Sequence, residues 1–63
     1  MSTMLKAKTK ENGEVEFGIQ QYEVGLYVCI YKNGRVLDQF GLNTTEEEFI
    51  TALESDPAIQ IIR

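Results

Sequence analysis

The chain has 63 residues, a formal net charge of −4 and no histidine, and Cys29 is its single cysteine. These counts exclude an intramolecular disulfide and a zinc site built by the chain alone. No segment approaches 18 consecutive apolar residues, and the first residues lack the apolar core of a signal peptide. We therefore expect one domain over residues 1–63, in the reducing cytoplasm, with no membrane partner.

The first predicted hairpin joins two runs that alternate with period two, residues 5–10 and 14–19. We prefer a three-residue loop at residues 11–13, with Gly13 left-handed, over a two-residue Asn-Gly turn. This loop sets unlike charges opposite each other, as Lys10 with Glu14 and Lys8 with Glu16. It also gathers apolar side chains on the other face: Leu5, Ala7 and Thr9 against Ile19, Phe17 and Val15.

The second predicted hairpin folds residues 26–31 onto residues 35–40 around Asn33-Gly34. A two-residue turn would pair Lys32 with Arg35, which are like charges. A three-residue loop avoids this pair and gives the partners Tyr31 with Arg35, Ile30 with Val36, and Leu26 with Phe40. We prefer the three-residue loop, since it collects apolar residues on one face: Leu26, Val28, Ile30, Val36 and Phe40.

A helix is predicted within NTTEEEFITALESDP, residues 43–57. Thr44 is the expected N-cap, because Glu47 three residues later completes a capping box. The helix dipole favours the acidic first turn, and Asp56-Pro57 ends the helix. Its narrow apolar stripe must pack on a sheet: Phe49, Ile50 and Leu53.

Together these elements predict an α+β fold of order ββββαβ, a four- or five-stranded mainly antiparallel sheet with one helix packed on one face. The last strand, AIQIIR at residues 58–63, is expected to lie parallel to the fourth or another strand after a right-handed crossover, or to pair across a dimer. The expected core residues are Phe17, Val28, Ile30, Phe49, Ile50 and Leu53.

The sequence carries no set of side chains suited to catalysis. Without histidine the commonest general base is missing, and Cys29 reads as a small buried residue of a central strand. No glycine-rich loop suited to phosphate is present. We therefore expect no enzyme activity, no catalytic residues, no bound cofactor and no metal.

The strand at residues 26–31 is apolar on both of its faces, whereas one short helix can cover only one side of a sheet. A stability estimate for a lone chain of this size comes out near zero, so help from a partner is expected. We predict a homodimer and a small protein-binding module, such as a regulator, inhibitor or accessory subunit. The expected interface residues are Tyr27, Tyr31, Leu37 and Arg35.

Two other functions are weighed against this one. Lys6, Lys8 and Lys10 share a strand face and would form a basic track for single-stranded nucleic acid, with sheet tyrosines as stacking platforms, although glutamates opposite them weaken its field. The consecutive acidic residues of the helix start would imitate phosphates and inhibit a nucleic-acid-binding protein: Glu46, Glu47 and Glu48. An acidic, capped helix start is the simpler explanation of these three residues.

Overall fold

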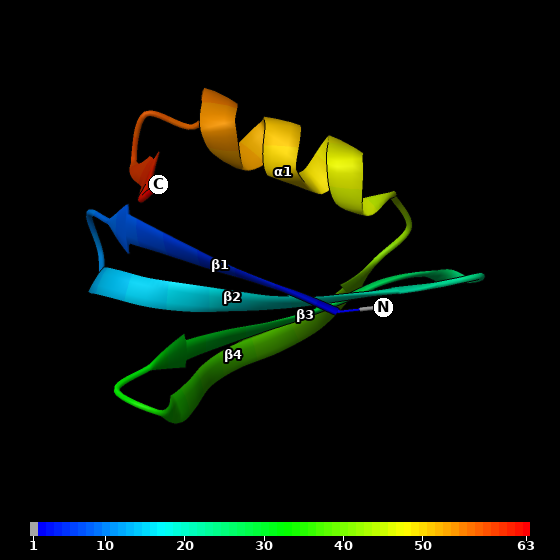
Figure 1. Ribbon diagram of the computed structural model, residues 1–63, viewed down its shortest axis with the longest axis horizontal. Helices are drawn as coiled ribbons and strands as arrows, with labels where there is room; N and C mark the ends of the chain where they lie inside the picture. Colours follow the sequence, from blue (N-terminus) through cyan, green and yellow to red (C-terminus); the bar gives the residue numbers. More distant parts are fainter. Residues whose placement is uncertain (1) are drawn as a thin grey trace.

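The structure, a computed structural model, describes residues 2–63 and has the predicted α+β architecture (Figure 1). The elements follow the order ββββαβ: β1 (Ser2–Thr9), β2 (Gly13–Tyr22), β3 (Gly25–Lys32), β4 (Arg35–Leu42), α1 (Glu46–Ser55) and β5 (Ile59–Ile61). The five strands form one sheet of order β4-β3-β2-β1-β5, in which every neighbouring pair is antiparallel. Figure 1 shows α1 on one side of this sheet, and the helix packs mainly against β5 and β2.

The last strand runs in the same direction as β4, as expected, but it is not paired in parallel with that strand or with any other. β5 lies antiparallel to β1, with Ala7 opposite Ile61 and Thr9 opposite Ile59. The crossover through α1 does return the chain in the direction of β4. However, β5 is added beside β1 at the far edge of the sheet, and β1 runs opposite to β4.

In the first hairpin the predicted faces and the left-handed Gly13 (φ +72°) are confirmed, but the register is two residues away from our prediction. Lys8 lies opposite Glu14, and Lys6 lies opposite Glu16. The reason is Thr9, whose hydroxyl donates to the Gly13 carbonyl (3.3 Å) and accepts from the Asn12 amide (3.0 Å). These bonds close the turn over residues 10–12, one position earlier than expected.

In the second hairpin the preferred three-residue loop is wrong. Asn33 (φ +52°) and Gly34 (φ +78°) form a two-residue turn that pairs Lys32 with Arg35. Such a turn matches the right-handed twist of the strands, and this outweighs a like-charge pair at an exposed tip. The same register puts Val36 opposite Tyr31, on the face away from the core, and a bulge beyond this pair leaves Leu37 without a partner.

The helix begins one residue later than predicted. Its N-cap is Thr45, whose hydroxyl accepts from the Glu48 amide at 3.2 Å. The displaced candidate, Thr44, instead donates to the Glu48 carboxylate at 3.3 Å. The side chain of Gln21, at the end of β2, accepts from the Glu46 amide at 2.8 Å and so fixes the start of α1 to the sheet.

The core lies between α1 and the sheet face beneath it. Phe49 contacts two other phenylalanines edge to face, Phe17 at 6.2 Å and Phe40 at 6.4 Å between ring centroids. Three of the predicted core residues are buried, and the other three (Ile30, Phe49 and Ile50) are half-buried against them. The buried set is Ala7, Val15, Phe17, Ile19, Leu26, Val28 and Leu53.

Candidate functional site

The sheet face that points away from α1, here called the open face, is covered by nothing within residues 2–63. Because side chains alternate along a strand, the positions that belong to it follow from the buried residues on the other side. On the four long strands they are Ser2, Met4, Lys6, Lys8, Glu14, Glu16, Gly18, Gln20, Tyr22, Tyr27, Cys29, Tyr31, Val36, Gln39 and Gly41.

One half of the open face is charged. Lys6 and Lys8 on β1 lie directly opposite Glu16 and Glu14 on β2. The structure gives none of these four residues an ion pair: the only salt bridge within residues 2–63 joins Arg63 to Glu54 elsewhere on the surface. The predicted basic track is therefore divided, since Lys10 lies in the β1–β2 loop and each lysine on the face has a glutamate beside it.

The other half of the open face is aromatic and carries no formal charge. Tyr27 is 37% exposed, Tyr22 is 52% exposed and Met4 is 58% exposed. The hydroxyl of Tyr22 donates to the side-chain oxygen of Gln20 (2.7 Å), and that of Tyr27 donates to the side-chain oxygen of Gln39 (2.8 Å). Both rings are thus held in place while much of their apolar surface stays in water.

A glycine forms the floor of a hollow in this aromatic half. A Cβ atom on Gly18 would lie 3.0 Å from the ring of Tyr31 and 3.4 Å from the sulfur of Met4. The hollow has a volume of about 350 Å³ and is lined on β3 by Tyr27, Cys29 and Tyr31. Close approach of two side chains to the backbone therefore explains glycine at this position.

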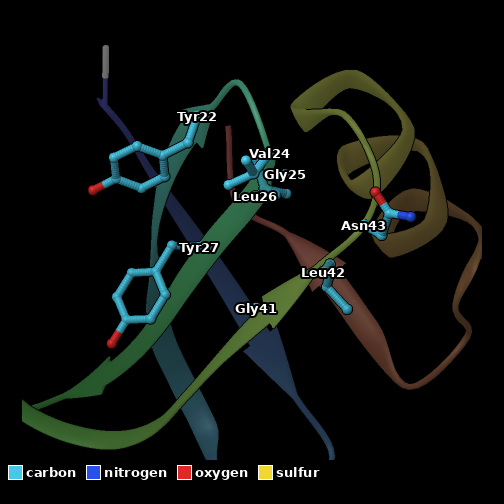
Figure 2. A pocket seen from close by; sticks show the side chains of 8 residues that line it. All are labelled: Tyr22, Val24, Gly25, Leu26, Tyr27, Gly41, Leu42 and Asn43. Atoms are coloured by element: carbon cyan, nitrogen blue, oxygen red, sulfur yellow. The ribbon is translucent and has the colours of Figure 1, made fainter.

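A larger, open depression of about 560 Å³ lies where the β2–β3 turn meets the end of β4 (Figure 2). Figure 2 shows the rings of Tyr22 and Tyr27 on one side of it and Leu42 on the other. Gly25 (φ +148°) is required here, because a Cβ atom would lie 2.6 Å from the Leu42 carbonyl oxygen. Val24, at the turn, is 91% exposed and adds to the apolar surface.

Cys29 lies between Tyr27 and Tyr31 on β3 and affects the ionisation of both. The pKa of each phenol is raised above 10.0, and the main cause is a hydrogen-bonding interaction with the Cys29 side chain. The second cause is partial desolvation for Tyr27 and the charge of Cys29 for Tyr31. The two phenols are therefore neutral at pH 7, and the aromatic half of the face has no charge there.

The other two predicted interface residues lie on β4, and their positions in the sheet differ from the ones we expected. Arg35 lies opposite Lys32 at the hairpin tip, and Leu37 is the extra residue of the bulge. Val36, which we placed on the same face as Val28 and Ile30, is 53% exposed and lies beside Tyr31 on the open face. Sequence reasoning also missed Met4, because the first strand was assumed to begin only at Leu5.

The three acidic residues of the helix start share the first turn of α1, and two of them, Glu47 and Glu48, line one shallow depression. Glu46 is half-buried, and its amide is bound to Gln21. The Glu48 carboxylate accepts from the hydroxyls of Thr44 and Thr45, both at 3.3 Å. The carboxylate of Glu48 therefore has a role in capping the start of α1.

A third depression, of about 340 Å³, lies on the other side of the sheet between α1 and β3–β4. Its floor is apolar and includes Phe17, Ile30, Phe40 and Phe49. Within the described chain no side chain that is buried is polar or charged, and no three His, Cys, Asp or Glu residues are close enough to hold a metal ion.

In comparisons with known proteins, no family model, no curated protein and no solved structure matches this chain. Across residues 2–63, no helix is both long and apolar enough to cross a membrane. The open face is thus the feature from which a function has to be argued.

Proposed function

We propose that this chain is a protein-binding module without catalytic activity, and that it binds through the open face of its sheet. The observation that carries this proposal is the uncovered aromatic half of that face, where Tyr22, Tyr27 and Met4 are exposed and the last two line the hollow at Gly18. Apolar patches of this kind mark interaction sites on monomeric proteins. Tyrosine and methionine are enriched in protein interfaces, whereas charged residues are depleted from their centres.

The total solvent-exposed area of the chain supports a partner protein that covers part of it. A folded monomer of 7.2 kDa is expected to expose about 4,100 Å². This chain exposes 4683 Å², about 560 Å² more. One partner's share of a standard interface is about 800 Å², so the excess amounts to about 70% of what one docked protein would bury.

A module with one binding face and no reactive group is suited to work as a regulator, an inhibitor or an accessory subunit. The lone Cys29 would stay reduced in the cytoplasm, where we place this activity. The bound protein would cover the two tyrosine rings and leave the acidic outer side of α1 in water.

Affinity capture with matched variants tests this function. The bait is the immobilised chain, exposed to a lysate of its source cell treated with nuclease. Tyr27→Glu places a charge in the aromatic half, and Glu47→Lys changes an exposed helix residue as the control. We expect a protein that the wild type and Glu47→Lys retain and Tyr27→Glu loses. Equal retention by all three baits contradicts the proposal.

A second candidate function, binding of single-stranded nucleic acid, is favoured by one observation: Lys6 and Lys8 share the open face with Tyr31. Aromatic rings beside cations are the usual platform for such ligands. Fluorescence anisotropy with a labelled oligonucleotide tests it, because this binding must weaken steeply as the salt concentration rises. Glu14 and Glu16, directly opposite the lysines, make it the weaker candidate.

A further inference from the structure

We infer that a second copy of this chain covers the charged half of the open face together with Met4 and Gly18, related by a twofold axis that runs parallel to β1 and β2 and midway between them. This inference rests on the proposed function, since it names the partner of the same face. Three observations support it: the order of side chains across the charged half, the lack of ion pairs for its lysines and glutamates within residues 2–63, and the exposure of these side chains and of Ile62.

The side chains across the charged half form a row with a symmetric order. Lys6 lies opposite Glu16, and Glu16 lies opposite Tyr31 on β3. On the other side of Lys6, the Ile62 amide donates to the Lys6 carbonyl at 2.9 Å. A hollow of about 170 Å³ is lined by all four residues, which places them on one face. The row therefore reads apolar, positive, negative, apolar: Ile62, Lys6, Glu16 and Tyr31.

When a second row of this kind is placed over the first in the reverse order, each positive residue faces a negative one and each apolar residue faces an apolar one. Rotation about the proposed axis lays β1 of one copy over β2 of the other. Lys6 then faces Glu16 of the second copy, and Ile62 faces Tyr31 of the second copy. The neighbouring row obeys the same rule, because Lys8 lies opposite Glu14 and comes to face it across the interface. A twofold interface requires such self-complementarity, and a different partner does not.

The charges in these rows are available for contacts between copies. Lys6, Lys8 and Glu14 are exposed and Glu16 is half-exposed, and none of the four makes an ion pair within residues 2–63. Ile62 is 42% exposed although it is a large apolar residue. The dimer gives each of these side chains a partner, including the one apolar residue after β5 that no contact in the lone chain explains.

Other twofold axes in the plane of the face give poorer matches. An axis between β2 and β3 would set Glu16 against Tyr31 and Lys6 against Val36, which leaves all the charges unpaired. The proposed axis also lays Met4 over the hollow at Gly18 of the second copy. Two sheets stacked in this way keep their strands within about 30° of each other, the usual angle for aligned sheets.

A charge-complementation experiment tests the dimer. The variant Lys6→Glu/Lys8→Glu makes the charged positions of both β1 and β2 negative, and the variant Glu14→Lys/Glu16→Lys makes them all positive. Each alone should lose self-association, with a dissociation constant weaker by about a hundredfold or more, because like charges then face each other. Mixed together they should form a one-to-one heterodimer. Light scattering at micromolar concentration measures all three masses against the wild type.

The control is Glu23→Lys/Glu47→Lys, which changes the net charge as much as the positive variant does but lies outside the rows, and it should stay dimeric. Circular dichroism checks that each variant is folded. If the charge-reversal variants unfold, Lys6→Gln/Lys8→Gln removes the attraction between copies without placing like charges opposite each other on β1 and β2. It should weaken the dimer, and 1 M salt, where the Debye length is about 3 Å, should weaken the wild type.

Two results overturn this dimer. A wild-type mass of 7.2 kDa at every concentration does so, and the open face then belongs to another protein, which the capture with Tyr27→Glu tests separately. A wild-type dimer whose mass none of the charge variants changes also does so, since self-association then uses a different axis or surface.

Discussion

The ring of Tyr31 lies against the backbone of Gly18 on the neighbouring strand, so close that a Cβ atom there would be 3.0 Å from its Cε2 atom. Tyr31 is thereby held beside the charged rows of the open face. A residue with a branched side chain at position 18 cannot leave the ring in this place. The glycine thus fixes the position of an aromatic side chain that we assign to the interface.

We predict that Gly18→Val displaces Tyr31 and weakens association while the protein stays folded. Valine favours strands, so the loss of packing around Tyr31 is offset and the free energy of unfolding should change by less than about 1 kcal/mol. Thermal unfolding and light scattering on the same sample separate the two effects. An unchanged dimer would show that the position of Tyr31 does not matter for association.

Gly25→Ala should destabilise the fold by about 1–3 kcal/mol, because the residue has a positive φ of 148° and its new Cβ atom would meet the Leu42 carbonyl oxygen. Gly41→Ala is the matched control on the adjacent strand. There the nearest atom would be 3.8 Å away, at ordinary contact distance. Urea denaturation of both variants measures the difference, and equal midpoints would contradict it.

Phe49→Ala should cost about 3 kcal/mol of unfolding free energy, the lower end for a phenylalanine, because the ring is half-buried between Phe17 and Phe40. A loss of this size should unfold most of a domain so small. Val24→Ala, at a residue 91% exposed, should change stability by less than about 0.5 kcal/mol. Parental melting of the Phe49 variant would mean that α1 packs through another face.

The position of the helix N-cap can be tested with two neighbouring threonines. Thr45→Ala removes the acceptor of the Glu48 amide and should cost about 1 kcal/mol. Thr44→Ala removes only an exposed hydroxyl–carboxylate contact and should cost less than about 0.5 kcal/mol. Denaturant unfolding distinguishes them, and the reverse order would restore Thr44 as the cap.

The raised pKa of Tyr27 and of Tyr31 predicts a titration that depends on Cys29. Ultraviolet absorbance of phenolate should show a midpoint above 10.0 for these residues, and Cys29→Ala should lower it toward that value. The sign for stability follows: a phenol whose pKa is higher in the folded state contributes below the unfolded pKa. That contribution is lost as the pH rises through the folded pKa. A midpoint that Cys29→Ala does not move would contradict the assigned cause.

The sequence predicted the element order, the apolar stripe of α1 and the left-handed Gly13, since each depends on local chemistry. It could not fix the hairpin registers. A shift of two residues, as at Lys8 and Glu14, keeps every side chain on the same face, so alternation does not detect it. In the second hairpin, turn twist and charge repulsion favoured different loops, and the preference of Asn33-Gly34 for positive φ prevailed.

The open face was predicted in part. Tyr27 and Tyr31 followed from a strand that is apolar on both sides, but Val36 was placed on the opposite face because the three-residue loop was preferred to the two-residue turn that pairs it with Tyr31. The symmetric row depends on β5 lying beside β1, which brings Ile62 next to Lys6. That pairing joins residues far apart in the chain, and no local pattern specifies it.

The bulge at Leu37 has a consequence for how large an assembly this chain can build. β4 is an edge of the sheet, and a regular edge strand offers its N–H and C=O groups to any further strand, with no limit to the number added. The extra residue breaks that spacing, and Arg35 and Asp38 put opposite charges on either side of it. The bulge therefore discourages the addition of strands from further copies at this edge. A dimer formed through the open face buries that face in both copies, so assembly by this route ends at two chains.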